Sequence, residues 1–365
     1  GDPVALEAMT TALNAGGTEA TKTAKQVGLQ PDTLGVGAST LGDVGGKIAT
    51  IVFNRLTSER AGIQYARPFT GIQYAGPITG HSAGNDPLAK AIWFKAFGVS
   101  SDQDSSDGIA GYTSKTAGIA TGFDVAVSDA SRIGISYSYA TTDVDGDGEG
   151  DSQVNINSHQ VSLYGDFTSE IYYLEGLVGI ALNENDRERI INFGGLNRTA
   201  SGSYENIQYS VTARAGVPLR ISNNIFVTPN AGLSWTHVGG EQYTETGAGS
   251  LNLTVKQENV DVALGSLGVR LHSVTNLGIG KRLTSDLRGS ILYDFAGDEA
   301  EATSTFTGGG AAFASKGAEV AQLGTTVGAG FTLDFGKLNF SVLYDAAFKA
   351  GYVSHTGAVR GKLRF

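Results

Sequence analysis

The residues best suited to chemistry are five acidic side chains that lie within nine positions, between residues 143 and 151. Four of them occupy positions 1, 3, 5 and 9 of a calcium-loop pattern: Asp143, Asp145, Asp147 and Asp151. Position 12, where that pattern needs a bidentate Glu, is Val154, and strand-like segments rather than helices flank the motif. The sequence therefore favours an acidic, flexible hairpin loop, with weak Ca²⁺ binding as the open alternative.

Histidines are the next candidates for metal binding or catalysis. The five of them are scattered, without metal-ligand spacing between any two: His81, His159, His237, His272 and His355. His159 and His237 have acidic residues near them, as an active site would need, but in a sequence region this acidic such neighbours arise by chance. The sequence therefore predicts no enzymatic activity, no cofactor and no metal site.

Most of the chain alternates apolar and polar residues with the period of two that is typical of β-strands. In the last such segment, Val359, Leu363 and Phe365 share one face, while Arg360 and Lys362 lie on the other. Twelve segments follow this pattern: 89–98, 112–127, 132–145, 153–168, 171–187, 203–220, 224–238, 256–274, 282–297, 319–334, 338–349 and 353–365.

The connections between these segments alternate in length. Short turns such as 128–131 and 336–337 alternate with mostly longer loops, namely 99–111, 146–152, 188–202, 239–255 and 298–318. Outer-membrane barrels show the same alternation of connection lengths, with short turns in the periplasm and long loops outside the cell. The sequence therefore predicts an all-β transmembrane protein, a 12-stranded antiparallel β-barrel over residues 89–365. We expect the long loops to be extracellular and the N- and C-termini of the barrel domain to be periplasmic.

Composition agrees with this fold class. The longest apolar runs, such as residues 91–94, are far too short for a transmembrane helix, and the formal net charge of −10 argues against a nucleic-acid partner. The chain also closes on an aromatic residue, Phe365. An ending within the last strand is typical of an outer-membrane barrel, because that strand must pair with the first to leave no open edge in lipid.

The first 60 residues favour helices, at 3–14, 19–27 and 43–60. The third helix carries one apolar stripe, and 18 residues at 1.5 Å each give about 27 Å, close to the thickness of a hydrocarbon core. We expect it inside the barrel, where its polar side would meet the inner wall through Lys47, Asn54, Arg55 and Glu59.

A linker over residues 61–88 separates this helix from the first strand. It contains a nine-residue tandem repeat, whose copies are residues 62–70 and 71–79. Two copies are too few for a solenoid, so we expect an extended segment and assign it no function.

A lumen-length helix, a linker, twelve strands and a terminal Phe together resemble the β-domain of classical (type Va) monomeric autotransporters. Residues 108–124 (GIAGYTSKTAGIATGFD) and 227–234 (VTPNAGLS) are most similar to the rickettsial surface-antigen group, which includes outer membrane protein B. The resemblance covers residues 43–365.

This resemblance implies a barrel that anchors in the bacterial outer membrane and holds the helix that tethers a secreted N-terminal passenger, with residues 1–42 as the helical end of the passenger. The implied partners are outer-membrane lipid and lipopolysaccharide, the barrel-assembly machinery, which would recognise Val359, Leu363 and Phe365, and the passenger itself. The implied state is a monomer.

Two observations limit the comparison. The serine-protease autotransporters cleave themselves at an Asn-Asn pair in the helix, but here Asn54 is followed by Arg55, so that reaction is not carried over. The linker over residues 61–88 is also longer than the direct connection that is usual in the family. The alternative function is a stand-alone porin-like channel or surface adhesin barrel without a secretion role. The helix distinguishes the two functions, because a porin needs an open lumen whereas an autotransporter barrel holds a helix in it.

Overall fold

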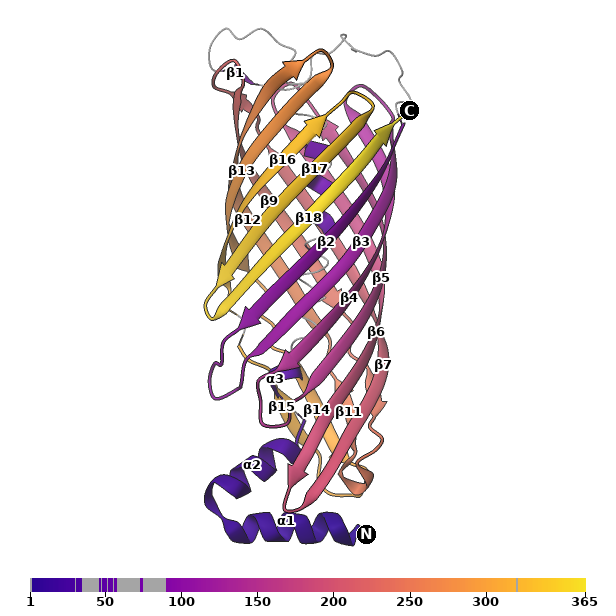
Figure 1. Ribbon diagram of the computed structural model, residues 1–365, viewed down its shortest axis with the longest axis vertical. Helices are drawn as coiled ribbons and strands as arrows, with labels where there is room; N and C mark the ends of the chain where they lie inside the picture. Colours follow the sequence, from indigo (N-terminus) through magenta and orange to yellow (C-terminus); the bar gives the residue numbers. More distant parts are fainter. Residues whose placement is uncertain are drawn as a thin grey trace.

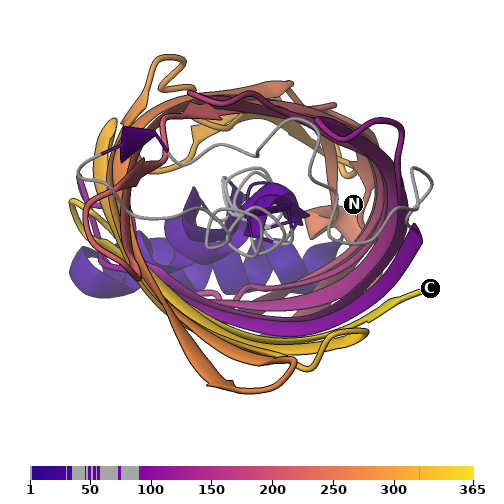
Figure 2. The ribbon, with the colours of Figure 1, turned by 90° about the horizontal axis from the view of Figure 1, so that it is seen from above.

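The protein is described by a computed structural model that covers residues 2–29, 31–34, 46, 48–50, 52–54, 56, 57, 73, 74, 90–319 and 321–365. Twelve antiparallel strands form a closed barrel, since β7 pairs with both β6 and β9 and so leaves no edge. Figures 1 and 2 show the tilted strands and the closed wall. The predicted 12-stranded antiparallel barrel is confirmed.

In chain order the barrel strands are β2 (Lys90–Gln103), β3 (Tyr112–Ala126), β4 (Ser131–Gly146), β5 (Gln153–Thr168), β6 (Tyr173–Phe193), β7 (Leu196–Gly216), β9 (Ile225–Val238), β12 (Val260–Gly278), β13 (Lys281–Asp294), β16 (Leu323–Asp334), β17 (Leu338–Lys349) and β18 (Tyr352–Arg364).

The two ends of the barrel differ in their connections. One end, here called the turn end, has short turns such as those at residues 127–130 and 335–337, together with Phe365. The other, the loop end, holds most of the longer connections and the N-terminal helices.

The expected loop at residues 188–202 was wrong. Strands β6 and β7 continue as a paired hairpin to Phe193 and Leu196, so the two longest strands project beyond their neighbours at the loop end. Gly194 and Gly195 form the tip with φ values of 55° and 82°, as a type I′ hairpin turn requires.

Two other expected loops are also ordered. The connections after β9 and β13 form a four-stranded sheet at the loop end. Its elements are β10 (Gln242–Thr244), η1 (Gly249–Leu251), β11 (Leu253–Gln257), β14 (Glu301–Phe306) and β15 (Phe313–Lys316).

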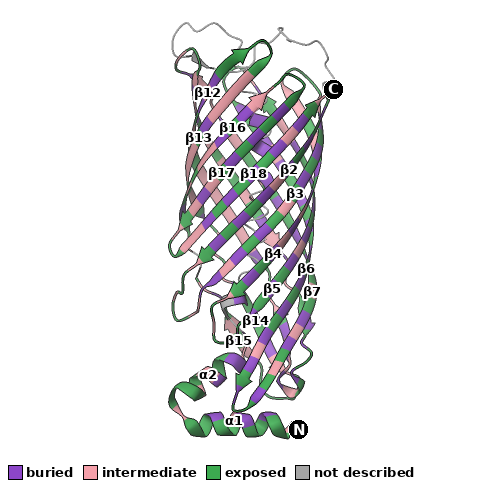
Figure 3. Ribbon diagram, in the orientation of Figure 1, coloured by how far each residue is buried: buried purple, intermediate pink, exposed green. Residues whose placement is uncertain are grey.

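The two faces of the wall have opposite character, as a strand period of two requires. Figure 3 shows exposed and buried residues alternating along the strands. Exposed apolar side chains on the outer face include Ile119, Val161, Ile180, Leu233, Leu267 and Val327, and buried polar ones on the inner face include Ser114, Ser138, Ser162, Gln208 and Ser341. Among the described residues, no helix combines the length and apolar character needed to span a bilayer.

Three helices precede the barrel in the described part of residues 2–34: α1 (Pro3–Ala15), α2 (Gly17–Val27) and α3 (Pro31–Leu34). They lie at the loop end, on the projecting β6–β7 hairpin and the small sheet (Figure 1). Asp2 caps α1, because its Oδ1 accepts a hydrogen bond from the Ala5 backbone N–H at 3.1 Å.

A further helical segment lies inside the barrel, where residues 46, 48–50, 52–54, 56 and 57 are helical. At the turn end, β1 (Gln73–Tyr74) pairs with β8 (Leu219–Arg220), which in turn pairs with β9. The second repeat copy therefore contributes a short strand, while the first copy lies outside the described residues.

Candidate functional site

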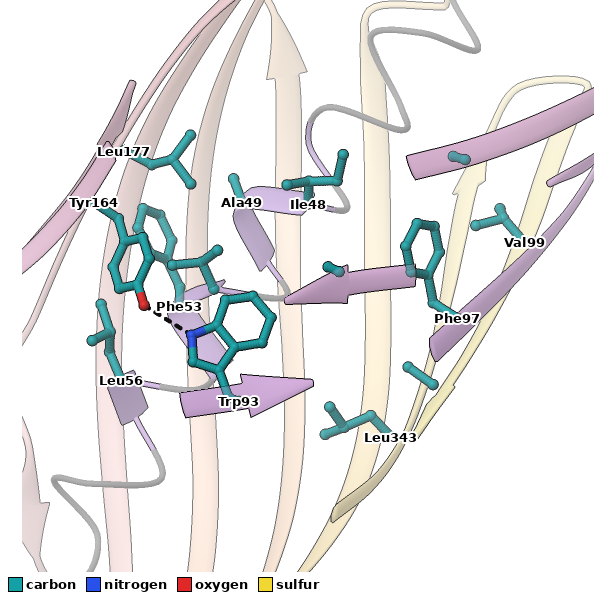
Figure 4. Packing of buried hydrophobic residues seen from close by; sticks show 14 residues of the cluster. Ile48, Ala49, Phe53, Leu56, Trp93, Phe97, Val99, Tyr164, Leu177 and Leu343 are labelled. Atoms are coloured by element: carbon teal, nitrogen blue, oxygen red, sulfur yellow. Dashed lines mark hydrogen bonds between the residues drawn. The ribbon is translucent and has the colours of Figure 1, made fainter. Parts of the chain in front are cut away.

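The apolar stripe of the lumen helix packs on the inner wall. Of the predicted stripe, Ile48, Val52 and Leu56 are described, and they are 3%, 0% and 1% exposed. They form one cluster with wall residues from seven strands: Trp93, Phe97, Val99, Ala120, Ala140, Tyr164, Leu177, Leu343 and Ala358. Figure 4 shows these side chains around the helix. The inner wall thus offers an apolar seat for the helix.

Trp93 is the largest side chain of this seat, and hydrogen bonds fix its position. Its Nε1–H donates to the Tyr164 hydroxyl at 2.8 Å, and that hydroxyl donates to Asp124 Oδ2 at 3.0 Å. Asp124 Oδ1 in turn accepts from Arg132 at 2.6 Å. This chain of bonds fixes the positions of both rings, which are tilted by 58° to each other, beside the helix.

Glycines opposite the two rings make room for them. Gly122 pairs directly with Trp93 across β2 and β3, and Gly134 pairs with Tyr164 across β4 and β5. A Cβ on Gly122 would lie 2.5 Å from the Trp93 ring, and one on Gly134 would lie 2.4 Å from the Tyr164 ring. Larger residues at these positions would displace the aromatic seat.

The opposite side of the helix meets polar wall residues. The Arg214 guanidinium lies 4.9 Å from the centre of the Phe53 ring, and its Nη2 donates to the Thr57 hydroxyl at 3.3 Å. Glu175 holds the same guanidinium, with its Oε2 2.6 Å from Nη2. A cavity of about 260 Å³ remains on this side, lined by helix residues and by β2, β6, β7, β9, β12, β13, β16, β17 and β18.

At the loop end, Arg189 joins α2 to the connection after β9. Its Nε and Nη2 donate to the two carboxylate oxygens of Glu245 at 3.2 and 2.6 Å, and its Nη1 donates to the Gln26 and Val27 carbonyls at 2.8 and 3.1 Å. These carbonyls end α2, where a cation is favourable. Both charged side chains are 4% exposed.

Asp2 and Arg198 form a second contact between the N-terminal helices and the loop end. Arg198 Nη1 donates to Asp2 Oδ2 at 2.5 Å and to the Ala248 carbonyl at 2.8 Å. The Arg198 bonds, with the Ala5 backbone N–H, hold the pKa of the Asp2 carboxyl well below its usual range, and Asp2 raises the pKa of Arg198.

Apolar contacts also hold the N-terminal helices on the loop end. We call α1, α2 and α3, together with the loop-end surface beneath them, the cap. Ala5, Ala8 and Ala12 of α1 are buried against Ile191 and Leu196 of the hairpin. Leu29 and Leu34 pack with Tyr243, Leu253 and Val255 of the small sheet. The cap therefore lies over the end of the barrel as a docked unit.

The predicted helix residues are only partly described. Asn54 lies on the lumen helix, is 8% exposed and lines the cavity. Lys47, Arg55 and Glu59 lie outside the described side chains, so their expected ion pairs remain predictions.

The three residues predicted as an assembly signal are exposed on the outer face of the barrel, two on β18 and Phe365 directly after it. Val359, Leu363 and Phe365 are 45%, 51% and 57% exposed. β18 pairs with β2, and Phe365 and Lys90 exchange backbone hydrogen bonds of 3.2 and 3.4 Å. The last residue therefore closes the barrel against the first strand, while its role as an assembly signal remains a prediction.

The calcium-loop pattern is divided between a strand and a loop, since Asp147 and Asp151 lie in the connection between β4 and β5. Asp143 and Asp145 belong to β4, where both are exposed, and the described residues contain no group of three His, Cys, Asp or Glu side chains arranged for a metal. The strand period extends further than the sequence suggested, which separates these carboxylates.

The described histidines mostly pair with aromatic residues. His159 Nδ1 lies 2.8 Å from the Tyr137 hydroxyl, His355 Nδ1 lies 2.8 Å from the Tyr344 hydroxyl, and His272 stacks on Phe226. His237 lies 3.1 Å from Asp261, whose Oδ1 also accepts from Trp235. His81 lies outside the described residues.

Comparison with known proteins decides the family. The profile described as "Autotransporter beta-domain" matches residues 92–345. The chain belongs to the autotransporter β-domain family. Like its relatives, this autotransporter β-domain is an outer-membrane barrel.

Relatives of this autotransporter β-domain include rickettsial surface proteins. Outer membrane protein A of Rickettsia conorii is 28% identical over 295 residues, which are 78% of this chain and 14% of that protein. Outer membrane protein B of the same species is 24% identical over 288 residues, 77% of this chain and 17% of that protein. The chain thus spans less than a fifth of the length of these curated relatives.

Solved structures agree on the fold. The translocator domain of the autotransporter NalP from Neisseria meningitidis matches with a TM-score of 0.63 at 16% identity, covering 90% of this chain and 99% of that one. The β-domain of the Bordetella autotransporter BrkA matches with a TM-score of 0.55 at 17% identity, covering 75% and 99%.

Proposed function

We propose that this autotransporter β-domain anchors in the bacterial outer membrane and mediates the export and surface display of an N-terminal passenger. One observation carries the proposal: the chain passes through its own barrel. The cap lies at the loop end, the lumen helix follows it in sequence, and β2 starts at the turn end. This path is the one that an exported segment still connected to its anchor would take.

The cap gives the exported end of the chain a fixed position. With the loop end extracellular, α1 to α3 lie outside the cell and are held by Arg189, Arg198 and the apolar layer. Residues 1–42 would then be the last part of the passenger and 43–60 its tether. We infer that cap and tether together hold the exported chain in place.

The proposed partners follow from this placement. The outer face of the wall would contact outer-membrane lipid and lipopolysaccharide. The barrel-assembly machinery would recognise β18 through Val359, Leu363 and Phe365, and the closed barrel would act as a monomer without catalytic activity of its own. Lys47, Asn54, Arg55 and Glu59 would hold the tether against the lumen wall.

A porin-like channel is the competing function, and the occupied lumen argues against it. A solute channel needs an open path, whereas here Val52 and Leu56 are almost completely buried against the wall. A surface adhesin barrel has no need for a helix in this position.

Surface display of an epitope placed before Gly1 tests the proposal. In intact Gram-negative cells, the epitope should be accessible to antibody and to added protease. The control is the same fusion without Phe365, which should lose display together with barrel assembly. An epitope that stays in the periplasm while the barrel is folded would contradict the export function.

A further inference from the structure

A hollow of about 680 Å³ lies in the outer face of the wall, across β6, β7, β9, β12 and β13. Its two charged lining residues, Glu175 and Arg214, turn toward the lumen, where their side chains form an ion pair at 2.6 Å and Arg214 contacts Phe53 of the lumen helix. The large side chains at its rim are all apolar or aromatic and are exposed on the outer face: Leu174, Leu233, Leu267, Ile291, Tyr293 and Phe295. The hollow therefore presents an uncharged surface to the surroundings of the barrel.

Small residues form the floor of this outer hollow. Ala215 pairs directly with Ala231 across β7 and β9, and Leu233 has Ala213 on one side and Gly265 on the other. Across β3 to β6 the same face is built of large side chains, which follow one another in register as Phe123, Ile135, Leu163 and Val178. The hollow is therefore a local feature of the residue types in β7, β9 and β12.

Aromatic pairs mark both ends of the outer hollow. At the loop end, Tyr293 and Phe295 pack edge to face with ring centres 5.1 Å apart. At the turn end, Leu174 pairs with Phe167, whose ring lies 6.2 Å from that of Tyr172. Aromatic girdles border the apolar band of a membrane barrel. The hollow therefore runs obliquely through the part of the wall that faces hydrocarbon.

The length of the outer hollow fits a lipid acyl chain. Neighbouring strands lie about 4.8 Å apart, so a hollow that crosses five strands extends over about 19 Å. The hydrocarbon core of a bilayer is about 30 Å thick, so the chains of one leaflet span about 15 Å. An acyl chain can therefore lie along the hollow from one aromatic pair toward the other.

We propose that the outer hollow is a binding site for one acyl chain of an outer-membrane lipid. The proposal rests on the anchoring of the barrel in that membrane and goes beyond its export function. A chain in a concave apolar site contacts protein on several sides, whereas a chain on the convex wall contacts it on one. The lipid in the hollow therefore binds more tightly than its neighbours. Because the lining that faces lipid is uncharged, the acyl chain and not the headgroup supplies the affinity.

Native mass spectrometry of the full chain in detergent tests the site, with dipalmitoyl phosphatidylethanolamine as the probe. The wild type should retain one lipid per chain. Ala215→Leu combined with Ala231→Leu fills the floor and should weaken retention about tenfold or more, because several buried CH₂ contacts are lost. Ala117→Leu is the matched control, since Ala117 is exposed on the outer face of β3, outside the hollow, and this variant should retain lipid as the wild type does.

Tryptophan fluorescence gives a second measurement, in solution. The chain has two Trp residues, of which Trp93 is 1% exposed in the lumen and Trp235 is 43% exposed on the outer face, two residues from Leu233. A phosphatidylethanolamine with brominated acyl chains, added in small amounts to mixed micelles, should quench Trp235 in a saturable way. In the Ala215→Leu/Ala231→Leu variant, quenching should rise only in proportion to the lipid added.

Migration of the unboiled variants on a gel shows whether each barrel is folded. If the double variant does not fold, Phe295→Ala takes its place, because it removes a rim side chain directly after β13 and should also weaken retention. Dipalmitoyl phosphatidylglycerol should bind as tightly as the phosphatidylethanolamine.

Three results would overturn the proposal. The first is a wild type that retains no lipid, and the second is a filled variant that retains it equally well. The third is a wild-type dimer that the filled variant loses, which would make a second copy of the chain the occupant. Surface display of the passenger is measured separately, so each of these results leaves the export function untouched.

Discussion

Arg189 and Glu245 form a bidentate ion pair at the loop end, with Nη2 and Oε2 2.6 Å apart and both side chains 4% exposed. The same guanidinium binds the last carbonyls of α2, and the same carboxylate accepts the Leu253 backbone N–H at 2.8 Å. Two side chains thus connect a helix, a barrel hairpin and a loop sheet.

Breaking this pair should release the cap. Arg189→Met leaves Glu245 buried without its partner, and loss of one member of a buried pair costs about 3–5 kcal/mol. We expect trypsin to cleave faster after Lys22 in α2, while the unboiled barrel migrates as before. Lys256→Ala is the control, because the Lys256–Glu258 pair is 64% and 55% exposed and contributes little. Equal cleavage of Arg189→Met and wild type would show that the cap is held by other contacts.

The Asp2–Arg198 contact should be sensitive to acid. The pKa of Asp2 is lowered in the folded protein, so the contact contributes stability above the ordinary Asp pKa and loses it as pH falls through the folded value. Cleavage of α1 by pepsin should therefore rise only well below about pH 4. In Asp2→Asn this extra acid dependence should vanish. A steep rise in wild-type cleavage already between pH 5 and 6 would rule out Asp2 as its source.

The position of the Trp93 ring should depend on the absence of a side chain at Gly122. Gly122→Ala puts a Cβ 2.5 Å from the ring, and such overpacking costs about 1–3 kcal/mol. The temperature at which the barrel loses its fast gel migration should fall. Gly357→Ala, where a Cβ meets nothing within 4 Å, should leave that temperature unchanged. If both variants behave alike, the close approach is not what requires glycine.

Removal of Phe365 should impair assembly. It abolishes the backbone exchange with Lys90 and takes an exposed aromatic from the outer face. The amount of folded barrel in the outer membrane should fall more than after deletion of Gly309, a loop glycine with open space around it. Wild-type levels without Phe365 would refute the signal assignment.

The helix should limit ion flow. Deleting residues 1–60 removes the tether and the cap, so conductance in planar bilayers should rise several-fold, as expected for an emptied lumen of a twelve-stranded barrel. The sheet closes through β7 and β9, so the shortened barrel should still fold. Unchanged conductance would place the helix outside the conducting path.

The barrel was predictable because its signal is local. Alternation along segments such as 132–145 and 338–349 gives strand positions almost without reference to the rest of the molecule. The cap was not predictable, because Arg189 and Glu245 are 56 residues apart and look like ordinary loop charges. One signal for the longer hairpin was available, because Ile191, Phe193 and Leu196 continue the apolar alternation of its strands. The mixed charges around these residues concealed that signal.

The apolar seat in the lumen was missed for a related reason. Trp93 and Phe97 alternate with Ile92 and Phe94, which are also apolar, so neither face of β2 could be assigned from its sequence. Only the register with Gly122 and Gly118 shows which rings point inward.

The β6–β7 hairpin tip also bears on the use of this domain as a display scaffold. A Cβ on Gly194 would lie 2.6 Å from the Ala8 carbonyl oxygen, so the most prominent tip of the barrel is also the floor beneath α1. Foreign peptides inserted there would lift the helix that they are meant to accompany. The connection between β14 and β15 has open space at Gly309 and Gly310 and can receive an insert without disturbing the exported chain.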